Sequence, residues 1–161
     1  VNGKGCSRYP KDYQQAYLVC MKLNVKKLYP DATVPARAHH DDAGLDLYSY
    51  ETFELAAGER RTVKTGIALA IPSGFVGLIW DKSSVPHKWG VKTMGGVIDA
   101  SYRGEIGVIM VNLSEETQKF EKGAKISQLL IQRVELPEVC EVTELDDTIR
   151  GEGGFGSTGT H

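Results

Sequence analysis

The chain has 161 residues, enough for one domain with a buried core. Hydrophobic residues make up 41% and charged residues 25% of it, and 19 basic side chains against 21 acidic ones leave a net charge of −2. This balance excludes a disordered chain, and it excludes a surface that binds nucleic acid or anionic lipid through bulk positive charge. No apolar run approaches the roughly 20 residues of a membrane-spanning helix, so we expect neither a nucleic acid nor a membrane as partner.

The first 22 residues differ from the rest of the chain. Their only apolar stretch, residues 17–21, falls short of the roughly 7–15 residues that form the apolar part of a signal peptide. Met21 opens a segment with a cleaner amphipathic pattern. We therefore expect residues 1–22 to be an N-terminal extension outside the core, followed by one domain over residues 23–148.

Cysteine usage indicates the redox compartment. The cysteines are scattered, odd in number and without a C-x-x-C pair: Cys6, Cys20 and Cys140. This pattern supports neither a zinc site nor a disulfide framework. Because free thiols are typical of a reducing compartment, we expect a cytoplasmic, intracellular protein.

Polar and apolar residues alternate with a period of two over much of the chain, which predicts strands. The strands are expected at residues 61–71, 104–112, 125–134 and 139–144. Turn signals separate them, at Ala57-Gly58, Pro72 to Gly74, Gly95-Gly96 and Lys122-Gly123. The best helical candidate is one short turn from Ser84 to Trp89, with Pro86 where a first helical turn tolerates proline. Several short strands at this spacing predict an all-β fold, an antiparallel barrel or sandwich.

Two strings imitate known sites. Residues 39–42 read His-His-Asp-Asp, but four adjacent loop residues cannot all aim at one metal ion, so we expect a solvated loop. Residues 151–158 fit part of the phosphate-loop pattern, but Ser157 stands where that loop needs lysine, and too few residues follow for a helix. A Ser-His-Asp hydrolase is unsupported as well, because the chain has no G-x-S-x-G elbow.

Five segments place polar or glycine residues where strand patterning predicts others. In the first, residues 43–47, Asp46 lies between two leucines and therefore alternates toward a cleft or the solvent. In the second, Lys82, Ser83 and Ser84 follow an apolar strand and lead into the expected helical turn. A cation, two hydroxyls and backbone N–H groups suit an anion there. A plain helix-capping serine is the alternative.

The third segment, residues 94–105, combines two glycines with a carboxylate and an aromatic side chain. Gly95 and Gly96 are expected to close a tight hairpin that leaves the backbone open to a flat ligand. Asp99 follows three residues after Gly96, and Tyr102 three residues after Asp99. A carboxylate beside an aromatic ring suits a general base that acts next to a stacked ring or sugar.

The last two segments are a polar residue in a strand and a glycine-rich terminus. The fourth, residues 123–131, places Gln128 in an otherwise apolar strand, where its amide needs hydrogen-bond partners, and a held water is one of them. The fifth, residues 150–159 within an expected C-terminal arm at 149–161, carries a cation, an aromatic ring and two hydroxyls among five glycines. Such an arm could close over a nucleotide, and a disordered tail is the alternative.

In this order and spacing the five segments resemble the five motifs of the trimeric deoxyuridine triphosphatases (dUTPases), from about residue 24 to residue 160. The most specific parts are GVIDASYRGE at 96–105 and RGEGGFGSTG at 150–159. The resemblance implies a distorted antiparallel jelly-roll barrel with at most one short helix, assembled as a homotrimer with shared active sites. It also implies Mg²⁺-assisted hydrolysis of dUTP to dUMP and pyrophosphate, which limits dUTP and supplies dUMP for thymidylate synthesis.

The resemblance further implies a role for each matching residue. Asp46 would bind the metal through water, Asp99 would activate the attacking water and orient the sugar's 3′-hydroxyl, and Gln128 would hold that water. The residues implied to bind the phosphates are Lys82, Ser83, Ser84, Arg150, Ser157 and Thr158. Those implied around the uracil and the deoxyribose are Gly96, Val97, Ile98, Tyr102, Phe155 and Gly156. In the family, the arm that covers the uracil comes from a different subunit than the pocket.

The chain departs from the common family pattern at three places. Lys82-Ser83-Ser84 replaces the usual Arg-Ser-Gly, which keeps the charge but loses the bidentate geometry of a guanidinium. Lys125 stands where arginine is common in the fourth motif. Met94 stands where a small residue is more usual.

Two other function classes share parts of this pattern. The dCTP deaminases resemble it in fold and often carry Ser-Ser in the second motif. Their catalytic glutamate, however, falls at Ile109 of this chain, and they lack the Gly-Phe-Gly-Ser-Thr arm. The other class is a dUTP-binding module without turnover, and against it the chain retains Asp46, Asp99, Gln128 and Arg150.

Overall fold

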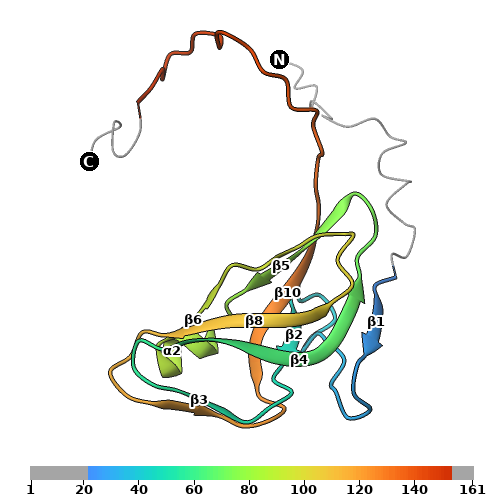
Figure 1. Ribbon diagram of the computed structural model, residues 1–161, viewed down its shortest axis with the longest axis vertical. Helices are drawn as coiled ribbons and strands as arrows, with labels where there is room; N and C mark the ends of the chain where they lie inside the picture. Colours follow the sequence, from blue (N-terminus) through green and yellow to red (C-terminus); the bar gives the residue numbers. More distant parts are fainter. Residues whose placement is uncertain (1–21, 154–161) are drawn as a thin grey trace, which may run out of the picture.

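The computed structural model describes residues 22–153 of the chain (Figure 1). The strands are β1 (Asn24–Lys27), β2 (Leu45–Tyr48), β3 (Phe53–Leu55), β4 (Arg60–Ala70), β5 (Phe75–Trp80), β6 (Val91–Met94), β7 (Val97–Ile98), β8 (Glu105–Asn112), β9 (Gln118–Phe120) and β10 (Lys125–Arg133). One short helix, α2 (Ser84–Trp89), completes this part of the chain. Every strand pair in it is antiparallel, which confirms the predicted all-β fold and the predicted helical turn.

The strands form two four-stranded sheets and one two-stranded ribbon. The first sheet has the order β1-β4-β8-β6, the second has the order β2-β10-β5-β7, and β3 pairs with β9. Most neighbouring strands are therefore distant in sequence. Segments from different parts of the chain meet on the second sheet, and this sheet carries the candidate site.

Burial with a period of two builds the core between the two larger sheets. In β8, Ile106, Val108 and Met110 are fully buried, whereas most residues between them are not. Leu47 of β2 and Leu129 of β10 join the same cluster from the second sheet. Each buried side chain of this size contributes about 1.5–3 kcal/mol. The alternation thus fixes which face of each strand turns inward and leaves the other face for polar residues.

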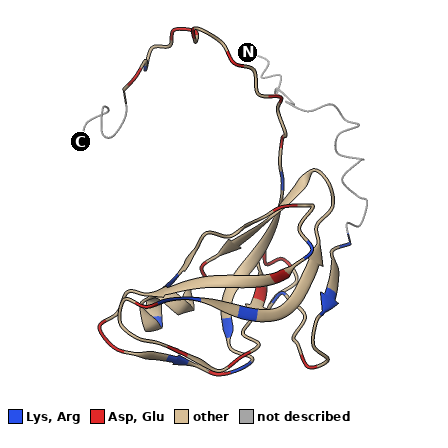
Figure 2. Cartoon of the chain, in the orientation of Figure 1, with Lys and Arg blue, Asp and Glu red and all other residues tan. Residues whose placement is uncertain are grey.

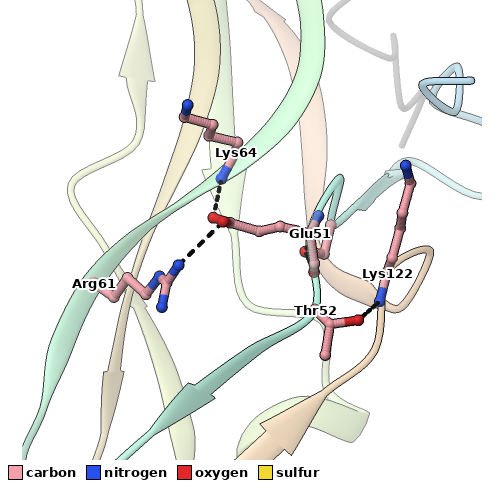
Figure 3. A network of polar contacts seen from close by, with 6 residues as sticks. Glu51, Thr52, Arg61, Lys64 and Lys122 are labelled. Atoms are coloured by element: carbon pink, nitrogen blue, oxygen red, sulfur yellow. Dashed lines mark hydrogen bonds and ion pairs between the residues drawn. The ribbon is translucent and has the colours of Figure 1, made fainter. Parts of the chain in front are cut away.

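A polar network fastens the connection between β2 and β3 to the rest of the fold (Figure 3). Glu51 accepts hydrogen bonds from the guanidinium of Arg61, at 3.0 Å, and from the backbone N–H of Lys64, at 3.4 Å. Next to it, the hydroxyl of Thr52 accepts from the backbone N–H of Lys122 at 3.1 Å. These contacts join the end of β2 to β4 and to the turn that precedes β10, and so they hold β2 in place.

Three of the four predicted strands form within one residue of their expected bounds, as β4, β8 and β10. The fourth prediction is wrong. Residues 139–144 form no strand and are exposed, because they find no partner strand within the described part of the chain. Figure 1 shows this segment leading away from the sheets. Positive φ angles mark the turns that were expected at Gly58, Gly74 and Gly123.

The tight hairpin expected at Gly95 and Gly96 is also wrong. β6, which precedes the two glycines, pairs with β8 of the first sheet, and β7, which follows them, pairs with β5 of the second. The glycines therefore carry the chain from one sheet to the other. Gly96 has φ 107° and its C=O accepts from Ile79 N–H at 2.8 Å, and a Cβ added there would lie 2.7 Å from Ile79 O. Only glycine fits this approach.

Basic and acidic side chains nearly balance in the full sequence, 19 against 21. In the view of Figure 2, basic and acidic segments are interspersed over the body of the fold. Within residues 22–153, no helix has the length and apolar character needed to cross a membrane. Because basic and acidic residues are interspersed, an anionic ligand must be held by individual cations rather than by a broad positive field.

Candidate functional site

A buried carboxylate lies at the centre of the candidate site. Asp46 of β2 is 4% exposed and stands opposite Gln128 of β10 in the antiparallel register. Lys82 Nζ lies 2.7 Å from its Oδ1, and Lys125 Nζ lies 2.8 Å from its Oδ2. Burial alone would raise the pKa of Asp46, but the hydrogen bonds from Lys125 and Lys82 outweigh it and hold the pKa below its ordinary value. Asp46 is therefore an anion between two cations.

The sequence predicted that Asp46 faces a cleft or the solvent. A solvent-facing orientation is wrong, because the two lysines and the strand pairing cover the carboxylate. Lys125, which stands where arginine is common in the family, contacts Asp46 directly. It is one of the site's cations, although the sequence analysis did not count it among the site residues.

Gln128 is fixed from both sides of its amide. Its Nε2 donates to the backbone C=O of Asp81 at 2.8 Å, which meets the predicted need for a hydrogen-bond partner. On the other side, a Cβ added at Gly44 would lie 2.9 Å from Gln128 Cδ, so a larger residue there would displace the amide from its present position. The glycine of the first segment therefore makes room for the glutamine of the fourth.

Lys82, Ser83 and Ser84 lie where β5 leads into α2. The C=O of Lys82 accepts from Val85 N–H at 2.7 Å as the helix begins. Ser83 occupies the position before the helix, yet its side chain makes no capping hydrogen bond. The alternative of a plain capping serine is therefore wrong. Ser83 is exposed and directly follows Lys82, whose ammonium pairs with Asp46, so a hydroxyl and a cation are both available here for an anionic oxygen.

Asp99 and Tyr102 form a separate turn after β7. Tyr102 N–H donates to Asp99 C=O at 3.1 Å, and the guanidinium of Arg103 donates to the C=O of Ala100 at 2.6 Å and of Tyr102 at 2.8 Å. A Cβ added at Gly104 would lie 2.6 Å from Tyr102 Cζ, so this glycine makes room for the ring. Both predicted side chains are exposed on a braced turn.

The strand register separates this turn from the other site residues. Ile98 stands opposite Gly77 of β5, and Gln128 stands opposite Trp80 of the same strand, with β7 and β10 on opposite sides of it. At about 3.3 Å per residue and about 4.8 Å between strands, this register puts the Cα atoms of Ile98 and Gln128 about 14 Å apart, and Asp99 follows Ile98 at the end of β7. We therefore expect that one water does not reach both side chains of the same chain.

The C-terminal arm is described only at its start. Arg150 is exposed, and its Nε donates to Gly153 C=O at 2.7 Å across a turn. Residues 135–152 are all exposed. Four predicted site residues lie outside the described part of the chain: Phe155, Gly156, Ser157 and Thr158.

The residues around Asp46 fit a magnesium ion held indirectly. Among residues 22–153, no three or more His, Cys, Asp or Glu side chains come together as a metal cage, and residues 39–42 form a loop in which 39–41 are exposed and Asp42 is half-buried. Mg²⁺ keeps several waters and is commonly bound through one or two carboxylates together with substrate phosphates. Asp46 supplies such a carboxylate, and its two lysine partners are groups that a polyphosphate can engage.

Comparison with known proteins identifies the family. The family model described as dUTPase matches residues 30–159. The chain belongs to the dUTPase family. Among curated dUTPase relatives, the deoxyuridine 5′-triphosphate nucleotidohydrolase of Mycolicibacterium gilvum is 50% identical over 147 residues, which cover 86% of this chain and 96% of the relative. That of Rhodococcus erythropolis is 46% identical over 144 residues, covering 88% of each chain.

Solved dUTPase structures resemble the fold of this chain. The dUTPase of Staphylococcus bacteriophage 80alpha, solved with dUpNHpp, superposes with a TM-score of 0.82 at 34% identity and covers 86% of this chain and 98% of its own. A mutant dUTPase from phage phi11 of S. aureus, described with a structural Mg(II) ion, has a TM-score of 0.74 at 30% identity and covers 79% of this chain and 100% of its own. The predicted jelly-roll fold of the dUTPases and the predicted enzyme class are confirmed.

Proposed function

We propose that the chain hydrolyses dUTP to dUMP and pyrophosphate as a homotrimer with shared active sites. The observation that carries this proposal is the division of the site residues within one chain. Asp46, Lys82 and Gln128 gather on one sheet, whereas Asp99 follows Ile98, which lies about 14 Å from Gln128 by the strand register. A second copy that brings its own Asp99 completes the site.

Exposed apolar side chains support the assembly. Leu78 and Val97 stand opposite each other on β5 and β7, so they share the outer face of the second sheet with Trp80. Trp80 is 58% exposed and Val97 68% exposed in the single chain. Large apolar side chains grouped in this way are typical of a surface that another chain covers.

The proposed chemistry is attack of a water on the α-phosphorus. Asp99 of the partner subunit takes the proton, and Gln128 holds the water as its oxygen forms a bond to phosphorus. The bond between the α-phosphorus and its bridging oxygen breaks, and pyrophosphate leaves. The cation and donors at Lys82, Ser83 and Ser84 bind the phosphates where charge develops. Mg²⁺, held through water by Asp46, would neutralise the phosphates when bound.

Recognition of the nucleoside is proposed for the segment from Gly96 to Tyr102. The backbone of Gly96, Val97 and Ile98 is fixed against β5, so its polar groups can read one edge of uracil, and a wrong edge leaves buried groups unpaired. The Tyr102 ring would pack against the deoxyribose and exclude a 2′-hydroxyl. The arm would then close the site, with Arg150, Ser157 and Thr158 on the phosphates and Phe155 and Gly156 over the uracil.

The division of the chain follows the same proposal. Residues 1–22 are proposed as an extension, residues 23–148 as the dUTPase domain and residues 149–161 as the arm. We also infer an intracellular location, because dUTP hydrolysis serves nucleotide metabolism and the three cysteines form no evident disulfide framework.

Product analysis tests the proposed function. The purified chain, with Mg²⁺, is incubated in heavy-oxygen water with dUTP, dCTP, dTTP or UTP in parallel. We expect turnover of dUTP alone, one dUMP and one pyrophosphate per dUTP, and the heavy oxygen in dUMP. Deamination of dCTP would favour the deaminase alternative. Heavy oxygen in pyrophosphate would contradict attack at the α-phosphorus, and binding of dUTP without products would indicate a binding module.

A further inference from the structure

Asp81 links the two sheets beside the candidate site, although no motif of the sequence analysis assigns it a role. It follows the last residue of β5 and precedes Lys82, and its side chain is 25% exposed. Its Oδ1 accepts from the backbone N–H of Thr93 at 2.6 Å, and its Oδ2 accepts from Lys92 Nζ at 2.6 Å. Both partners belong to β6 of the first sheet, whereas β5 belongs to the second.

The carboxylate is held as an anion by these contacts. Burial alone would raise the pKa of Asp81, but the hydrogen bonds from Lys92 and from Thr93 outweigh it and lower the pKa. A charged acceptor strengthens both hydrogen bonds. The side chain of Asp81 therefore ties the end of β5 to β6.

The same residue orients the glutamine through its backbone. The C=O of Asp81 accepts from Gln128 Nε2 at 2.8 Å, so the side chain and the backbone oxygen of one residue join β6 to β10. The Gln128 amide has little room to turn away, because Gly44 lies against its other side. The orientation of the amide thus depends on where Asp81 stands.

We propose that Asp81 is a positioning residue for the reaction, which acts through Gln128: its carboxylate docks on β6, and its carbonyl then sets the Gln128 amide against the attacking water. This inference rests on the proposed function. The sequence offers one signal for it, since a carboxylate ends an otherwise apolar strand directly before the cation of the second segment.

Kinetics of three variants test the inference. Asp81→Ala removes both acceptors, Asp81→Asn keeps an oxygen for the Thr93 N–H, and Lys92→Met removes only the ion pair. We expect Asp81→Ala to lower kcat for dUTP about tenfold or more, with KM within about threefold of the parent, because a small misplacement of a group that acts in the transition state lowers kcat. The other two variants should retain most of kcat.

A double-mutant cycle separates positioning from a general structural effect. In a Gln128→Ala background, Asp81→Ala should lower kcat less than about twofold, because the group through which it acts is already gone. Asp31→Ala is the matched control, since Asp31 pairs with Lys122 at the same 2.6 Å outside the site, and its kcat should equal the parent's. Equal losses from Asp81→Ala with and without Gln128, or no loss at all, would overturn the inference.

A measurement that needs no turnover distinguishes this inference from the proposed function. The side-chain amide protons of Gln128, observed by NMR in the full chain, should shift and exchange faster in Asp81→Ala than in the parent or in Asp31→Ala. An unchanged Gln128 amide would contradict the positioning role even in a chain that turns over dUTP. If the Gln128 amide shifts but the parent chain leaves dUTP intact, the proposed function is wrong, whereas the dependence of the Gln128 amide on Asp81 holds.

Discussion

At the scale of single residues, the site is organised around one carboxylate with two ammonium partners. Asp46 neutralises only one of the two charges on Lys82 and Lys125, so this point of the second sheet keeps a net positive charge. Removing the carboxylate would leave two lysines repelling each other in a partly buried place. The arrangement suits a polyanion that carries its own magnesium, because the incoming phosphates can share the lysines with Asp46.

Asp99→Asn tests the proposed general base. Asparagine has the same shape but cannot take a proton from water, so we expect dUTP binding close to the parent's and a kcat lower by about 10²–10⁴-fold. Equilibrium binding of a non-hydrolysable dUTP analogue and steady-state turnover measure the two effects separately. Hydrolysis by this variant at the parent rate would end the proposed role of Asp99.

At the scale of elements, the crossing from β6 to β7 depends on one glycine. Gly96→Ala places a methyl group 2.7 Å from Ile79 O at a φ of 107°, so we expect a loss of about 2–4 kcal/mol in the free energy of unfolding. Gly123→Ala is the control, because its φ is 85° but nothing lies within 4 Å of the added carbon. It should lose about 1 kcal/mol. Urea denaturation measures both, and equal losses would show that the close approach to Ile79 does not matter.

Sequence pattern predicted the elements where local alternation and tertiary pairing agree. β4, β8 and β10 are long, and each has a polar face and an apolar face, so they follow from residues alone. Residues 139–144 have a similar alternation but no partner strand in the described chain, and a strand needs one. The hairpin at Gly95 failed for a related reason, because glycines permit a sharp turn without specifying which strands pair on either side.

Sequence pattern singled out Asp46, Lys82 and Gln128, which the structure brings together, because these residues interrupt the strand pattern, and their roles stay predictions. It could not show that Asp46 is buried, since this depends on Lys125, which comes from a strand distant in the chain. It could not show the role of Asp81 either, because a carbonyl contact to Gln128 leaves no mark on residue type. Only the register could show that Asp99 and Gln128 lie apart.

At the scale of the whole molecule, shared sites predict complementation between inactive variants. Subunits carrying Asp99→Asn keep Gln128, and subunits carrying Gln128→Ala keep Asp99. When the two are unfolded, mixed in equal amounts and refolded together, about a quarter of the sites in randomly assembled trimers should combine both intact residues. The mixture should then regain about a quarter of the parent turnover.

The control for complementation is each variant refolded by itself at the same total concentration. Light scattering on every sample establishes whether it has the mass of three chains. A mixture no more active than the sum of its components, with that mass confirmed, would show that Asp99 and Gln128 act within one chain. The proposed division of the active site between two chains would then be wrong.

The segment that follows β10 leaves large apolar side chains exposed in the single chain. Leu136, Val139 and Leu145 are 78%, 93% and 85% exposed, so folding of one chain leaves them in water. In the proposed homotrimer we expect neighbouring chains to cover them, and stability gained in this way grows with protein concentration. We therefore expect dilution to destabilise this protein as a denaturant would, because a chain separated from the proposed homotrimer returns these side chains to water.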